Sequence, residues 1–213
     1  MALTLHYLSG SPFAWKVWLA LEHKGTPYEL RVVSRDGGDL ATDQFRTLNP
    51  HRKAPVLEHD GFVLYESSAI IEYLEEVFPE RPLWPSDIRG RAIARRVMAE
   101  CQSSLYPPVR RIVEAVLMDG GARPDEGAVT AALNEASAAA GILEGSLTAP
   151  FFNGDTPGAS DYSLYPLSAI MARLEKSLAS KGPSFDLSES FIDWRARMST
   201  QSIVVATQPP HWN

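Results

Sequence analysis

The chain of 213 residues carries a formal net charge of −6, and 45% of its residues are apolar. This length accommodates one large or two small globular domains, and an acidic balance without runs of like charge disfavours a nucleic-acid partner. The single cysteine, Cys101, excludes an internal disulfide, and the lack of a signal-peptide pattern or a long apolar run predicts a cytoplasmic protein with no membrane partner.

The first 78 residues predict alternating strands and helices in the order βαβ-ββα. Leu3, Leu5 and Tyr7 alternate as in a half-buried strand, whereas Phe13 and Val17 begin a helical stripe. A βαβ unit implies two parallel strands joined by a right-handed crossover. The expected elements are strands Leu3–Leu8 and Tyr28–Val33, helices Pro12–Lys24, Asp43–Leu48 and Ser67–Val77, and the hairpin strands Val56–His59 and Phe62–Tyr65 around Asp60-Gly61.

After residue 78 the sequence no longer predicts alternating strands and helices. Prolines 79, 82 and 85 exclude a continuous helix and indicate a stiff linker at residues 79–86. Residues 87–213 show no strand periodicity and predict an all-helical domain, with Pro107-Pro108 kinking or splitting its first helix. The expected helices are Ile88–Met118, Ala128–Leu147, Ser160–Ala179 and Ser188–Met198, with loops that include Asp119–Pro124, Thr148–Gly158 and Lys181–Ser184.

The turn between the first strand and the first helix ends at Ser11, which Pro12 follows. Serine is a favoured N-cap and proline a favoured first helical residue, so the simplest role for Ser11 is to cap the helix. A helix N-terminus also attracts an anion, and a bound thiolate would fit there. Both roles use the same geometry.

Pro55 opens the first hairpin strand, where a proline removes no ladder hydrogen bond. A trans proline that starts an edge strand is one interpretation. The other is a cis Ala54-Pro55 bond, which would turn the N–H and C=O groups of Ala54 outward to pair with an extended peptide. After the hairpin, Glu66 and Ser67 stand at a helix start, where Ser67 is a good N-cap.

In this order and topology, the serine turn, the Lys53-Ala54-Pro55 strand entry and the Glu66-Ser67 pair resemble the cytosolic glutathione transferase family, in its serine-type form. The resemblance covers essentially the whole chain. It implies a thioredoxin-like, glutathione-binding domain at residues 1–78, followed by the all-helical domain at 87–213. It further implies that Ser11 stabilises the thiolate, Lys53 meets the glycine carboxylate, Ala54 and Pro55 form the cis-proline pair, and Glu66 and Ser67 bind the γ-glutamyl end.

The resemblance implies a homodimeric transferase that uses glutathione as co-substrate against a small hydrophobic electrophile, as in detoxification. Spacing of the histidines predicts no metal. The family's loop into a buried helix has Gly158 at the cap position, so we expect Asp161 to secure that helix start. The second substrate is expected to contact one helix of the second domain, near the tail 209–212; the candidate residues on this helix are Met98, Cys101, Gln102, Leu105, Tyr106, Val109 and Arg110. The same spacing fits residues of a helical core equally well. Cys101 in particular is expected to be buried.

Several alternatives stay open. Ser9 is a second candidate for the thiolate-stabilising hydroxyl. A protein-interaction module that has lost catalysis would keep the same fold. Thiol reduction is disfavoured because Ser11 stands where reductase-like members carry cysteine. Maleylacetoacetate isomerisation is disfavoured because Gly10-Ser11-Pro12-Phe13 replaces the Ser-Ser-Cys turn of those members.

Overall fold

A computed structural model describes residues 2–118, 125–178 and 184–212. The chain forms two compact units, one made of Met1–Trp84 with Thr200–Asn213 and the other of Pro85–Ser199. The division falls within the expected linker at 79–86. It differs from the expected helical domain 87–213, because the residues from Thr200 onward pack with the first unit. The expected loop 119–124, the first three residues of the expected loop 181–184, and the expected helix end at Ala179 lie outside the described residues.

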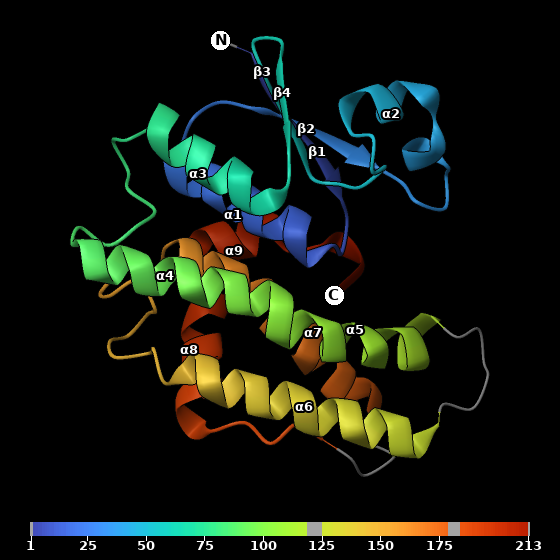
Figure 1. Cartoon of the computed structure of the whole chain (residues 1–213), viewed down its shortest axis with the longest axis vertical. Helices are drawn as coiled ribbons and strands as arrows, with labels where there is room; N and C mark the ends of the chain where they lie inside the picture. The colour runs from blue at the N-terminus through green and yellow to red at the C-terminus, as the bar shows by residue number, and fades with distance from the viewer. Residues whose placement is uncertain (1, 119–124, 179–183, 213) are drawn as a thin grey trace. The chain divides into compact units, whose positions relative to one another are not determined.

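The first unit contains a four-stranded sheet in the order β2-β1-β3-β4 (Figure 1). The β1 and β2 strands are parallel, and the other neighbouring pairs are antiparallel. The expected thioredoxin-like βαβ-ββα order is confirmed. The elements are β1 (Leu3–Leu8), α1 (Pro12–Lys24), β2 (Glu29–Val33), α2 (Asp43–Leu48), β3 (Val56–His59), β4 (Phe62–Tyr65), α3 (Ser67–Val77) and α9 (Ser202–Thr207), with 3₁₀ turns at Asp39–Ala41 and Pro210–Trp212.

Alternation along β1 decides which side chains meet which helices. Tyr7 is buried and its ring lies edge-on to Trp18 of α1, with centroids 4.9 Å apart. His6 points to the opposite face, where its ring meets Phe45 of α2 at 6.0 Å. Accordingly, α1 and α3 lie side by side on one face of the sheet and α2 lies on the other (Figure 1).

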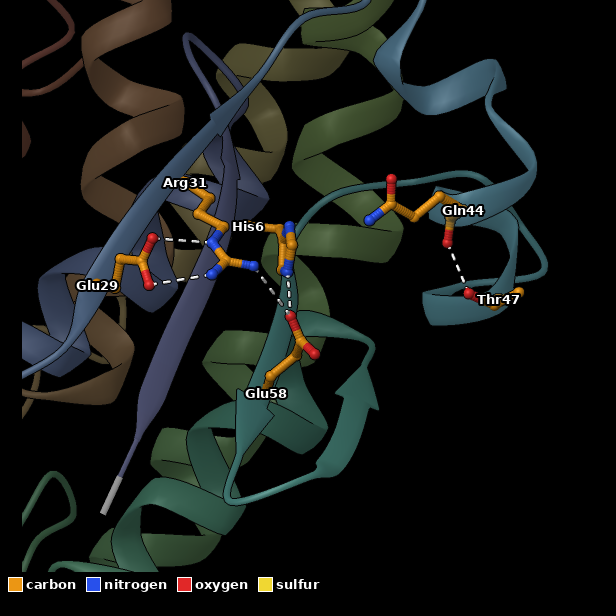
Figure 2. Close-up of polar contacts among 6 residues, drawn as sticks. All are labelled: His6, Glu29, Arg31, Gln44, Thr47 and Glu58. Carbon is orange, nitrogen blue, oxygen red and sulfur yellow. Dashed lines mark hydrogen bonds and ion pairs between the residues drawn. The ribbon is translucent and has the colours of Figure 1, made fainter.

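The α2 face also carries a cross-strand polar network (Figure 2). His6 Nε2 lies 2.5 Å from Glu58 Oε1, and Arg31 Nη1 lies 3.9 Å from the same oxygen. Arg31 donates two hydrogen bonds to Glu29, at 2.9 and 3.2 Å, which lower the pKa of that carboxyl. Because β2 is an edge strand, these exposed charges oppose pairing with a foreign strand.

The second unit is helical (Figure 1). The first expected helix is a continuous helical run interrupted as predicted: the Tyr106 N–H bonds to the Cys101 oxygen, a wider π turn that accommodates the missing N–H of Pro107. Capping by Asp125 starts α6 two residues before the expected Ala128. The elements are α4 (Ile88–Glu100), α5 (Tyr106–Val113), α6 (Glu126–Glu144), α7 (Ala159–Leu178) and α8 (Glu189–Ser199), with π-helical segments at Cys101–Leu105 and Glu114–Met118.

Asp161, in the first turn of α7, organises the loop before that helix. Its fully buried carboxylate accepts hydrogen bonds from the backbone N–H groups of Phe152, Asn153 and Gly158 at 2.9–3.1 Å. It also accepts one from Trp194 Nε1 of α8 at 2.8 Å. Burial raises the pKa of Asp161 to about 6, while the N–H donors oppose that rise by favouring the charged form. The expectation that Asp161 secures this helix start is confirmed.

We predict that Asp161→Asn lowers the free energy of unfolding by about 2–4 kcal/mol, because the amide replaces one acceptor oxygen with a donor facing other donors. Urea unfolding followed by circular dichroism measures the loss. Asp193→Asn, at an exposed position of α8, is the matched control and should stay within about 0.5 kcal/mol of wild type. Equal effects of the two substitutions would contradict the role given to Asp161.

Candidate functional site

Ser11 stands at the N-terminus of α1, as predicted. Its backbone is extended, with φ −75° and ψ 121°, and its Oγ accepts a hydrogen bond from the Ala14 N–H at 3.3 Å. The Ser11 N–H in turn donates to the Leu8 oxygen at 3.1 Å and closes the turn after β1. As an acceptor toward Ala14, the hydroxyl still has its own proton to donate to a ligand.

Ser9, the alternative hydroxyl, is engaged differently. Its Oγ lies 3.3 Å from Nδ1 of His211, in the 3₁₀ turn at the end of the described chain. Between the two serines, Gly10 adopts φ 80°, a conformation that favours glycine. The hydroxyl at the helix start is therefore that of Ser11, whereas Ser9 faces the C-terminal segment.

The strand entry has the predicted geometry. The Ala54–Pro55 peptide bond is cis, and Pro55 is buried. Neither the N–H nor the C=O of Ala54 makes a hydrogen bond with any residue in the described part of the chain. The backbone of Ala54 is thus left available for an added peptide segment.

The loop before Ala54 is held by Asn49, which the sequence analysis did not single out. This side chain is 2% exposed; its Nδ2 donates to the Lys53 oxygen at 2.6 Å, and its Oδ1 accepts from the His51 N–H at 2.9 Å. The ring of His51 also contacts Tyr65, at the end of β4. Lys53 itself is exposed, and its ammonium bonds to no described residue. An asparagine directly before Pro50 was the signal available in the sequence.

Glu66 and Ser67 begin α3, but not as predicted. The expectation that Ser67 is the N-cap is wrong: Glu66 occupies that position, Ser67 is the first helical residue, and no side chain caps the helix. The uncapped N–H groups and their positive potential suit an anionic ligand. Glu66 has φ 70° and ψ 106°, a strained conformation for a residue other than glycine.

A buried lysine brings the two helix starts together. Lys16 of α1 is 2% exposed, and its Nζ donates to Ser68 Oγ in the first turn of α3 at 3.1 Å. This bond joins α1 just after the Ser11 cap to the residue after Ser67. The predicted site residues of the first unit therefore surround one region of the sheet, at the starts of α1, β3 and α3.

The residues suggested for the second substrate divide into two groups. Met98, Cys101, Leu105 and Val109 are at most 5% exposed and belong to a core, which confirms the expected burial of Cys101. Gln102, Tyr106 and Arg110 are at least partly exposed and stay candidates.

Among residues 2–118, 125–178 and 184–212, no three His, Cys, Asp or Glu side chains lie close enough together to hold a metal ion. Within the same ranges, none of the helices has the length and apolar character needed to span a membrane.

Because the backbone at Glu66 is strained, we predict that glycine is more stable than alanine at this position, the reverse of the usual order in a helix. Both substitutions remove the carboxylate, but glycine adopts φ 70° freely, so Glu66→Gly should be more stable than Glu66→Ala by about 1 kcal/mol. At the exposed helical position Asn134 of α6 the order should reverse, with glycine less stable by about 1 kcal/mol. Thermal and urea unfolding of the four variants gives the comparison, and the same order at both positions would refute the strain.

Comparison with known proteins agrees with this geometry. Residues 5–82 match the family model "Glutathione S-transferase, N-terminal domain". A maleylacetoacetate isomerase of Dictyostelium discoideum is 41% identical over 99 residues, 46% of this chain and 45% of that protein. The first curated relatives are thus matched over about half of their length.

Solved structures match over nearly the whole chain. A glutathione S-transferase from the Antarctic clam Laternula elliptica has a TM-score of 0.81 and 27% identity, covering 100% of this chain and 94% of the other. The holo form of a bacterial zeta-class maleyl pyruvate isomerase has a TM-score of 0.74 and 27% identity, with coverage of 98% and 97%. Residues 5–82 thus belong to the glutathione S-transferase N-terminal domain family, and over nearly its whole length the chain resembles solved glutathione transferases in fold.

Proposed function

We propose that this protein binds glutathione and stabilises its thiolate for attack on a small hydrophobic electrophile. The observation that carries the proposal is the arrangement in the first unit of a serine hydroxyl at a helix start, an unbonded Ala54 backbone and an uncapped helix α3. Each of these matches a different part of an extended, anionic peptide that bears a thiol. Function in the cytoplasm as a homodimer belongs to the same proposal and is supported by the family alone.

Glutathione would lie across the three features in an extended conformation. The N–H and C=O groups of Ala54 would pair with its peptide backbone as a neighbouring strand does. The exposed ammonium of Lys53 would meet the glycine carboxylate. The N-terminus of α3 would hold the γ-glutamyl carboxylate, with Ser67 as a hydroxyl donor and Glu66 facing the ammonium group.

The chemical task is to keep a thiol ionised near neutral pH. A free thiol has a pKa of about 8.5, and lowering it by two units requires about 2.7 kcal/mol of preference for the thiolate. A hydrogen bond to a charged group contributes roughly 1.5–3 kcal/mol, and the N-terminus of α1 adds its own positive potential. Ser11 Oγ can accept from Ala14 and donate to sulfur at the same time. The sulfur, not the serine, would be the nucleophile.

A second candidate is a glutathione-dependent isomerase. The relatives named maleylacetoacetate isomerase and maleyl pyruvate isomerase favour it, although Gly10-Ser11-Pro12-Phe13 departs from the Ser-Ser-Cys turn. Both reactions need the same thiolate, and they differ in whether the product keeps the glutathione. Mass spectrometry of the products formed from maleyl and from aryl halide substrates separates them.

We predict that Ser11→Ala raises the thiol pKa of bound glutathione by about 1–2 and lowers kcat/KM by about 10- to 100-fold, because the hydrogen bond to the thiolate is lost. Thiolate absorbance in an ultraviolet difference titration reports the pKa. Since alanine also removes a cap, Ser11→Gly, which retains most helix-start stability, serves as a second variant and should behave alike.

If the wild-type protein binds glutathione without lowering the pKa of its thiol, the proposed enzymatic activity is refuted and a protein-interaction module is favoured. Ser104→Ala, at an exposed position of the second unit, is the control and should leave the titration unchanged.

Replacing Lys53 tests the carboxylate contact. We predict that Lys53→Gln raises KM for glutathione about three- to tenfold while kcat changes less than twofold, because the charge acts equally on the bound ground state and the transition state. Steady-state kinetics at low and high salt measure the effect, which should shrink at high salt. Arg35→Gln, exposed elsewhere in the same unit, makes the same charge change; an equal rise in its KM would indicate a general field instead of a contact.

A further inference from the structure

The C-terminal segment returns to the turn that carries Ser11. Trp15 of α1 donates from Nε1 to Thr207 Oγ1 at 2.8 Å, between two buried side chains. Five residues later the ring of Trp212 packs edge-on against the ring of Trp15, with centroids 5.3 Å apart. Two contacts to one tryptophan therefore fix the path of the chain between residues 207 and 212.

This path lays His211 on the turn between β1 and α1. Nδ1 of its ring lies 3.3 Å from Ser9 Oγ. A Cβ atom placed on Gly10 would lie 3.1 Å from Nε2 and 3.4 Å from Cε1 of the same ring. The imidazole thus covers the glycine directly before Ser11, and its close approach is a second reason, besides φ 80°, for glycine at that position.

Ser9, Gly10 and Trp212, which lie against this imidazole, carry no charge. Beneath the turn, burial raises the pKa of Tyr7, so its phenol stays neutral, and Ser9 and Gly10 lie beside it. The first turn of α1, residues 12–15, and α9, residues 202–207, contain no ionisable side chain. The nearest lysine along α1, Lys16, directs its ammonium to Ser68.

We propose that His211 is a further catalytic residue of the reaction proposed above: it accepts the thiol proton of bound glutathione and then faces the thiolate as an imidazolium. In this step the S–H bond breaks, its electron pair stays on sulfur, and the proton forms an N–H bond at Nε2. We take Nδ1 as the donor in the 3.3 Å contact with Ser9 Oγ, the tautomer in which Nε2 is the base. The inference rests on the proposed glutathione-dependent function.

The division of roles between Ser11 and His211 has a chemical reason. A serine hydroxyl donates a hydrogen bond to a thiolate but does not take up the proton that the thiol must lose. Imidazole is the side chain that most often exchanges protons near neutral pH. A hydroxyl on one side and an imidazole over the adjacent glycine would supply both functions.

The test is the pH dependence of His211→Gln, which retains a hydrogen-bonding side chain but not the base. At pH 6.5 the rate should fall about five- to tenfold, and at pH 9, where solvent ionises the thiol, it should lie within about twofold of wild type. The thiol pKa of bound glutathione should be about 0.5–1 higher in this variant than in wild type. Ser9→Ala should shift it in the same direction by a smaller amount, because it frees Nδ1. His23→Gln, in the last turn of α1, is the control and should not shift it.

Other outcomes overturn the inference in distinguishable ways. An equal loss of rate at both pH values would make His211 a structural contact, and an unchanged profile would make it a bystander. If wild type and His211→Gln both lower the thiol pKa equally, only the inference about His211 fails. If wild type binds no glutathione, the proposed function fails and the inference fails with it.

Discussion

Helix α1 buries polar side chains that its own backbone cannot satisfy, and the rest of the first unit is arranged to satisfy them. Trp15 bonds to Thr207 and Lys16 bonds to Ser68. The Lys24 ammonium, with a fully buried side chain, bonds to Glu75 and to the carbonyl oxygens of Phe78 and Arg81. An unpaired buried ammonium is costly, so these contacts fix the C-terminal segment, the start of α3 and the segment after it against one helix.

The two helix starts that meet through Lys16 are built for different tasks. At α1, Ser11 supplies the capping oxygen and Gly10 gives the turn its shape, so the helix is complete before any ligand arrives. At α3 no side chain caps the backbone, and Glu66 holds a strained conformation. The N-terminus of α1 is suited to a ligand that needs one hydrogen bond, and the N-terminus of α3 to a ligand that brings its own hydrogen-bond acceptors.

Local patterns were sufficient where a feature depends on near neighbours. The strands, the Asp60-Gly61 turn and the capping of α1 by Ser11 follow from adjacent residues, and the proline entry and Asp161 gained support from a family resemblance. Two features were not predicted, each for its own reason. The assignment of Ser67 as N-cap was wrong because the chain bends at Glu66, where φ is positive although nothing in a glutamate signals it. The return of residues 200–212 to the first unit depends on Trp15, nearly two hundred residues away.

The proposed glutathione residues Ser11, Lys53, Ala54, Pro55, Glu66 and Ser67, together with His211, all belong to the first unit. Conjugation and isomerisation would therefore begin from the same bound thiolate, and these residues do not choose between them. The choice must come from side chains that recognise the electrophile. Of the residues predicted for the second substrate, Met98, Cys101, Leu105 and Val109 are buried in the core of the second unit, so only Gln102, Tyr106 and Arg110 remain candidates for a ligand contact.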